Sequence, residues 1–107
     1  MKPEFENVPL VRNDVMRQFE MKIDGMKAFI EYEERDDKMF LVHAEVPLAF
    51  QGRGTGAALV EKTLVYLEEK NIALVPMCSF VVDYMRQHPE WKRILAKGIN
   101  LDSGRVH

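Results

Sequence analysis

Three glycines at alternate positions could bind a phosphate group. Gly52, Gly54 and Gly56 stand between a run of β-type residues that ends at Val46 and an amphipathic segment that begins near Thr55. Glycine tolerates positive φ and lets the backbone approach a ligand closely. Successive N–H groups that lead into a helix N-terminus attract anions, because the unpaired amides and the helix dipole point at the ligand. The segment therefore indicates either a phosphate or pyrophosphate site or an ordinary tight strand-to-helix loop.

Two common phosphate-binding patterns do not fit this loop. A Walker loop ends in Gly-Lys followed by Ser or Thr, and no lysine follows these glycines. A dinucleotide fingerprint can be read as Gly52-x-Gly54-x-x-Ala57, but it belongs in the first βαβ unit, with an acidic residue about 20 residues further on. Here hairpin-like strands come first, and the next acids, Glu68 and Glu69, fall at a helix end.

A third pattern, Gln51-x-x-Gly54-x-Gly56, has the right spacing between a strand and a helix. It resembles the Gln/Arg-x-x-Gly-x-Gly/Ala signature of the GNAT acetyltransferases, which bind the pyrophosphate of acetyl-coenzyme A. The resemblance implies acetyl-CoA as the cofactor. The cofactor-binding residues that it implies are Val46, Gln51, Gly52, Arg53, Gly54, Thr55, Gly56 and Ala57.

Acetyl transfer also needs groups that move protons, because an acceptor amine must lose a proton and the departing thiolate must regain one. Cys78 follows a predicted strand beside the glycine loop, where open α/β units place ligands, although free cysteine is often a small core residue. His43 is a possible base or a structural residue on one face with Leu41 and Glu45. In the larger relatives a tyrosine beyond this strand often protonates the thiolate, which implies that role for Tyr84. The candidate catalytic residues are therefore Cys78, His43 and Tyr84, and no metal site is expected.

The bulk properties are those of a small soluble protein. The chain has 107 residues, a net charge of −2 and 47% hydrophobic residues, so a single domain over residues 1–107 is expected. The charge favours neither nucleic acid nor anionic membrane as a partner. The single cysteine, the charged N-terminus and the absence of a long apolar run predict a cytoplasmic protein.

Alternating polarity in the first half predicts an antiparallel meander. Asp24-Gly25 is a strong hairpin signal, and Arg35–Lys38 reads as a second turn. The third strand is apolar on both faces except for His43 and Glu45, so it should be central. The expected segments are a loose lead-in over 1–12 and strands over 15–23, 27–33 and 39–46.

Helical spacing of apolar residues in the second half predicts a crossover unit. A helix over 55–70 should end with Asn71 at its C′ position and lead into a strand over 72–77 that runs parallel to the third. A short helix over 79–88 follows, then a turn at Pro89. The last residues, 97–107, are expected to be a flexible tail with His107 at its end.

A second group of motifs strengthens the resemblance. Cys78-Ser79-Phe80-Val81 and His88-Pro89-Glu90 resemble segments of very small, bacterial-type GNAT-like proteins, with the likeness covering roughly residues 15–95. The larger acetyltransferases carry a pair of helices where Asp24-Gly25 makes a hairpin, and those helices help to shape the acceptor pocket. The motifs therefore do not indicate which amine accepts the acetyl group.

The predicted fold is α+β, a mixed sheet with a GNAT-like acyl-CoA N-acyltransferase core, made of an antiparallel meander, a β-loop-α-β crossover and short C-terminal helices. The resemblance implies an acetyl-CoA-dependent N-acetyltransferase acting on an unidentified amine, as a monomer or homodimer. A non-catalytic acyl-CoA-binding module and a purely structural α+β domain remain as alternatives.

Overall fold

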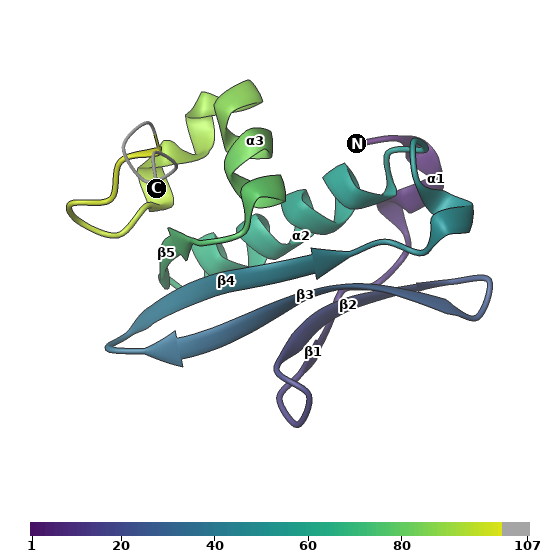
Figure 1. Ribbon diagram of the computed structural model, residues 1–107, viewed down its shortest axis with the longest axis horizontal. Helices are drawn as coiled ribbons and strands as arrows, with labels where there is room; N and C mark the ends of the chain where they lie inside the picture. Colours follow the sequence, from purple (N-terminus) through teal and green to yellow (C-terminus); the bar gives the residue numbers. More distant parts are fainter. Residues whose placement is uncertain (102–107) are drawn as a thin grey trace.

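A five-stranded sheet with the order β1-β2-β3-β4-β5 organises the molecule, seen in a computed structural model that describes residues 1–101 (Figure 1). The strands are β1 (Val11–Asn13), β2 (Gln18–Ile23), β3 (Met26–Arg35), β4 (Lys38–Glu45) and β5 (Ala73–Pro76). The helices are α1 (Pro3–Glu6), α2 (Thr55–Glu69) and α3 (Ser79–Gln87), with 3-10 turns η1 (Leu48–Phe50) and η2 (Pro89–Ile94). The predicted α+β class, with its meander and crossover, is confirmed.

Two tight hairpins join the meander strands. Asp24 and Gly25 have φ of 51° and 77°, and Asp36 and Asp37 have φ of 53° and 62°. Positive φ at both central residues matches the twist of the flanking strands and fixes their register. Met21 therefore lies opposite Ala28, and both belong to the buried core.

The chain crosses over through α2, so β5 runs parallel to β4. Strand β4 therefore pairs with β3 on one side and β5 on the other, which is the internal position predicted for it. Asn71 ends the helix in the left-handed region at φ 57°. Its N–H bonds Glu68 O at 3.1 Å, and the N–H of Ile72 bonds Leu67 O at 2.9 Å. This pair of bonds satisfies carbonyls that a helix end otherwise leaves unpaired, as expected for a C′ residue.

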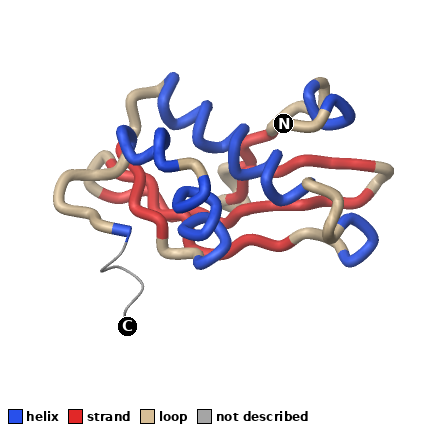
Figure 2. Tube along the Cα trace, turned by 90° about the horizontal axis from the view of Figure 1, so that it is seen from above, coloured by secondary structure: helices blue, strands red, loops and turns tan. Residues whose placement is uncertain are grey.

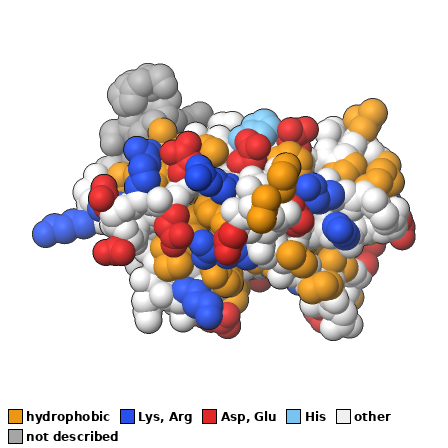
Figure 3. All heavy atoms as spheres, turned by 90° about the horizontal axis from the view of Figure 1, so that it is seen from below, with side chains coloured by type: hydrophobic (Ala, Val, Ile, Leu, Met, Phe, Trp, Pro, Cys, Tyr) orange, Lys and Arg blue, Asp and Glu red, His pale blue; other side chains and the backbone are white. Residues whose placement is uncertain are grey.

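The helices lie on one side of the sheet, with α2 across the strands and α3 beside it (Figures 1 and 2). The core forms between them from Phe19, Ile30, Leu41, Leu64 and Met85, each 0% exposed. The opposite sheet face carries charged side chains interspersed with apolar ones (Figure 3), and in Figure 1 no helix of the described residues lies over it. In residues 1–101 no helix is both long and apolar enough to span a bilayer.

The first residues are more ordered than the predicted lead-in over 1–12. They contain α1, whose Phe5 is 3% exposed, and the edge strand β1, which pairs Arg12 with Phe19. The predicted strand over 15–23 begins only at Gln18, after a turn. The lead-in was misjudged because a three-residue strand is too short to show a period.

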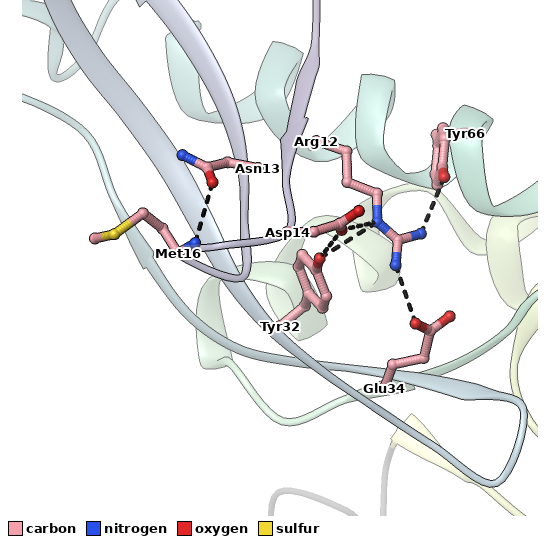
Figure 4. Close-up of polar contacts among 7 residues, drawn as sticks. All are labelled: Arg12, Asn13, Asp14, Met16, Tyr32, Glu34 and Tyr66. Atoms are coloured by element: carbon pink, nitrogen blue, oxygen red, sulfur yellow. Dashed lines mark hydrogen bonds and ion pairs between the residues drawn. The ribbon is translucent and has the colours of Figure 1, made fainter.

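Arg12 joins three elements through its guanidinium group (Figure 4). It bonds Tyr66 of α2 at 3.0 Å and Glu34 of β3 at 3.0 Å, and it lies 5.0 Å from the ring centre of Tyr32. The Tyr32 hydroxyl in turn bonds Asp14. This bond and the Arg12 guanidinium hold the pKa of the Asp14 carboxyl below its usual value. The cluster ties the edge strand to the sheet and to α2.

The C-terminal segment is anchored up to the last described residue. Ala96 donates its N–H to Leu74 O at 2.8 Å, and Leu101 is 4% exposed with its carbonyl bonded by Arg86 at 2.9 Å. Leu101 of the predicted tail over 97–107 is thus packed against the fold, the flexibility of that tail stays a prediction, and its remainder, including His107, lies outside the described residues.

Candidate functional site

Strands β4 and β5, on one side of the sheet, part midway along β4. They pair only from Lys38 to Leu41 on β4, and Leu41 O accepts the N–H groups of Met77 and Cys78 at 2.9 and 3.0 Å. Beyond that point β4 continues to Glu45, whereas the segment after β5 turns away into α3. The fork leaves an edge of β4 whose backbone groups are available to an extended ligand.

A bulge in β4 lies at the same place. Tyr32 pairs with Leu41 while its neighbour Glu31 pairs with His43, so Val42 is an extra residue on the β4 side. An extra residue shifts the two-residue alternation by one position. Ala44 therefore shares the helix-covered face with Leu41, and His43 lies on the open face.

A pocket of about 520 Å³ lies where the end of β4 meets the glycine loop. Its lining includes six of the predicted cofactor residues, namely Val46, Gln51, Gly52, Gly54, Gly56 and Ala57, together with Ala44, Phe50 and Phe80. The loop needs its glycines, because Gly52 and Gly54 have φ of 77° and 87°. The side-chain amide of Gln51 donates through Nε2 to Val46 O at 3.2 Å and holds the loop against the end of the strand.

The first turn of α2 follows this loop and contains unpaired polar groups, although Thr55 itself does not line the pocket. The opening N–H groups of an α-helix have no partner inside the helix. Thr55 adds a hydroxyl that is buried, at 1% residue exposure, and has no hydrogen-bond partner among the described residues. A hydroxyl of this kind fits a ligand that brings acceptor oxygens, such as a pyrophosphate.

Phe80 closes one side of the pocket. A Cβ placed on Gly56 would lie 2.4 Å from the Phe80 ring, so the ring occupies the space that any other residue at position 56 would fill. Phe80 is nevertheless 42% exposed and faces the pocket. Phe80 is not among the site residues predicted from the sequence, because nothing in helical spacing distinguishes it from a core aromatic.

Cys78 stands at the fork. It is the N-cap residue of α3, its N–H bonds Leu41 O, and its side chain packs half-buried against the core. This is the predicted position, at the carboxyl end of β5 beside the strand that leads into the glycine loop.

The structure does not bring His43 to Cys78. His43 is 53% exposed on the open face, where its Nε2 lies 3.1 Å from Glu45 Oε2. The prediction that His43 shares a face with Leu41 is wrong, because the bulge at Val42 reverses the alternation between them. His43 therefore has Glu45 rather than the thiol as its neighbour.

Tyr84 is buried between α3 and α2 rather than placed at a pocket rim. It is 9% exposed, stacks on His88 with 4.3 Å between ring centres, and has Glu61 and Trp91 near its hydroxyl. Burial, followed by the nearby carboxylates of Glu61 and Glu90, raises the pKa of Tyr84 to about 12. The group stays protonated at neutral pH.

Arg53 is a predicted cofactor residue that does not line the pocket, although it lies over the ring of Phe50, which does. Its guanidinium lies 3.9 Å from Glu4 Oε2 and 5.1 Å from the ring centre of Phe50. Lys2 contacts the loop backbone instead, because its Nζ donates to Arg53 O at 3.0 Å. The sequence could not reveal this contact, because the two residues stand 51 positions apart.

The family model for the GCN5-related N-acetyl-transferase matches residues 18–94. The chain belongs to this family, the GNAT acetyltransferases that the glycine motif resembled. Among curated proteins it is similar to Protein NATD1 of Xenopus tropicalis, with 30% identity over 76 residues that cover 68% of this chain and 70% of the relative. Protein NATD1 of Mus musculus and of Homo sapiens each share 29% identity over 76 residues, covering 68% of this chain and 69% and 67% of the relatives.

Proposed function

We propose that this protein is an acetyl-CoA-dependent N-acetyltransferase that acetylates an amine of a small molecule or a protein. The observation that carries the proposal is the pocket of about 520 Å³ between the glycine loop and the forked end of β4. Family membership supports the same chemistry.

The glycine loop and the first turn of α2 would hold the pyrophosphate. Their backbone N–H groups supply donors, the α2 dipole supplies partial positive charge, and the orphan Thr55 hydroxyl would gain an acceptor. The free edge of β4 beyond Leu41 would bond the extended arm of the cofactor. When bound, acetyl-CoA supplies an acetyl group activated as a thioester.

Cys78 is the group proposed to act at the reacting end, because it stands at the fork and packs on the same side of the sheet as the pocket. As a thiolate it would take the acetyl group, and as a thiol it would give its proton to the departing sulfur. Tyr84 is 9% exposed and does not line the pocket, which makes it the weaker candidate for the acid.

Thermal unfolding with and without acetyl-CoA tests the binding half of the proposal. A ligand that binds only the native state adds about 2.7 kcal/mol at 100 times its dissociation constant, so millimolar acetyl-CoA should raise the melting temperature. Release of free CoA during incubation with a panel of amines tests the catalytic half. Unchanged melting at saturating acetyl-CoA contradicts the assignment.

A non-catalytic acyl-CoA-binding module is the second candidate. It is favoured by the positions of His43 and Tyr84, since the first lies on the open sheet face and the second is enclosed between helices. This alternative predicts a melting shift with acetyl-CoA and no release of CoA above the rate of spontaneous hydrolysis with any amine in the panel.

A further inference from the structure

The segment that precedes the family match folds over the glycine loop. The match begins at residue 18, yet Phe5 is 3% exposed in the core, and Lys62 donates to Glu6 O at 3.3 Å. The N–H of Phe5 bonds Lys2 O at 3.0 Å, which places Lys2 directly before the anchored turn α1. The segment is thus held on α2 at one end of the pocket.

Lys2 lies against the loop backbone. Its Nζ donates to Arg53 O at 3.0 Å, and its Cε would lie 3.2 Å from a Cβ placed on Gly54. An ammonium group has three donors, and this contact uses one of them. The side chain therefore holds a positive charge beside the residue that caps α2, where the helix dipole already favours an anion.

Two further polar side chains belong to the residues on either side of Gly54. Thr55, next to Gly54, has a buried hydroxyl without a partner among the described residues. Arg53, the cation that sequence motifs suggest for the phosphate, is instead directed to Glu4 at 3.9 Å. The ammonium of Lys2 thus lies beside Gly54, the N-cap residue of α2, and the Thr55 hydroxyl and the first-turn amides belong to the residues that follow it.

We propose that Lys2 is a cofactor-binding residue whose ammonium group binds the pyrophosphate of acetyl-CoA at Gly54, so that the segment before the family match completes the site. The inference rests on the proposed function, because it needs CoA at the glycine loop. It assigns the phosphate contact to Lys2 in place of Arg53.

Calorimetric titration of the full chain, carrying no N-terminal tag, tests the assignment. The ligands are CoA, dephospho-CoA, which keeps the pyrophosphate, and pantetheine, which has no phosphate. Lys2→Ala should weaken CoA and dephospho-CoA equally, by about tenfold, because a charge-assisted bond is lost. Lys2→Arg should restore most of the affinity, since it keeps the charge. Binding of pantetheine should not change.

Lys70→Ala is the matched control, because it removes the same charge at the other end of α2, where Lys70 lies over Tyr66. Its CoA affinity should equal that of the wild type. The difference in CoA affinity between the wild type and Lys2→Ala should become smaller as the salt concentration rises, as expected for an exposed ionic contact.

Three results overturn the assignment. Equal CoA affinity of wild type and Lys2→Ala removes Lys2 from the site while leaving the proposed function intact. A loss confined to CoA and absent from dephospho-CoA places Lys2 at a different phosphate. Absence of CoA binding by the wild type overturns both this inference and the proposed function. Melting curves of the apo variants show whether each is folded, and exposed Lys2 should tolerate replacement.

Discussion

At the scale of single residues, the loop depends on the backbone of Gly54 more than on any side chain. Gly54 has φ of 87° and caps α2, so a side chain there is strained whatever space surrounds it. The nearest atoms belong to the flexible end of Lys2, which can move aside. The conformational preference, rather than a clash, therefore makes this position sensitive.

Gly54→Val should abolish CoA binding and leave a folded protein. The β-branched side chain resists positive φ and blocks the close approach of a phosphate, at a stability loss of roughly 1–2 kcal/mol. Calorimetric titration measures the binding and circular dichroism the fold. Gly98→Val is the control, because Gly98 also has positive φ, at 86°, but lies outside the pocket lining. Normal CoA binding by Gly54→Val would place the pyrophosphate elsewhere.

Cys78→Ala should slow acetyl transfer much more than it weakens binding of acetyl-CoA. The thiol stands at the fork, and its removal takes away either the nucleophile or the proton donor while the glycine loop is untouched. Rates of CoA release compared with calorimetric affinities separate the two effects.

Mass spectrometry of the wild type distinguishes the two roles of Cys78. With acetyl-CoA and no amine, covalent transfer leaves an adduct of about 42 Da on Cys78, because the thiolate displaces CoA and keeps the acetyl group. Proton donation leaves no adduct, and Cys78→Ser then keeps partial activity. A transfer rate of Cys78→Ala equal to that of the wild type makes Cys78 a core residue.

At the scale of elements, Tyr84 of α3 is buried near the carboxylate of Glu61 on α2. Its folded pKa of about 12 lies above the ordinary value of 10.0, so the folded chain keeps a proton that the unfolded chain loses between these values. The unfolded state then binds fewer protons, and the free energy of unfolding falls as pH rises. The stabilisation is complete below pH 10 and is lost toward pH 12.

Tyr84→Phe should therefore flatten the loss of stability between pH 10 and about 12. The difference in the free energy of unfolding between the wild type and Tyr84→Phe should shrink over this pH window by on the order of 2 kcal/mol, since each pKa unit corresponds to about 1.4 kcal/mol. Urea unfolding at several alkaline pH values measures it. Parallel curves for the two proteins over the window would show that the hydroxyl titrates as in the unfolded chain.

At the scale of the whole molecule, Arg12 connects the edge strand, the middle of the sheet and the distal half of α2 (Figure 4). Its side chain is 21% exposed, and its guanidinium lies 5.8 Å from the ring centres of Phe19 and Tyr66. These contacts lie on the part of α2 remote from the glycine loop, so they stabilise the scaffold without touching the pocket.

Arg12→Ala should lower the free energy of unfolding by about 2–3 kcal/mol, because it removes a partly buried charge network and the packing of the guanidinium on aromatic rings. Arg12→Lys should recover less than half of the loss, since a lysine cannot reproduce the planar fork. Urea unfolding measures both. CoA affinity should stay within about twofold of wild type, and a larger change would mean that the cluster also shapes the pocket.

The sequence by itself determined the local features of this protein. The Asp24-Gly25 hairpin, the end of α2 at Asn71 and the glycine loop were predictable, because turn geometry and helix capping depend on a few neighbouring residues. The family was predictable because Gln51-x-x-Gly54-x-Gly56 carries its own spacing between a strand and a helix. The role of Cys78 at the fork remains a prediction.

The tertiary structure alone decided which side chains meet. One extra residue at Val42 turned His43 to the open face, and a bulge leaves no mark on the periodicity of so short a strand. Packing between helices enclosed Tyr84, and the return of the chain brought Lys2 to Gly54. Contacts between residues far apart in sequence depend on how all elements pack together, and local spacing carries no record of them.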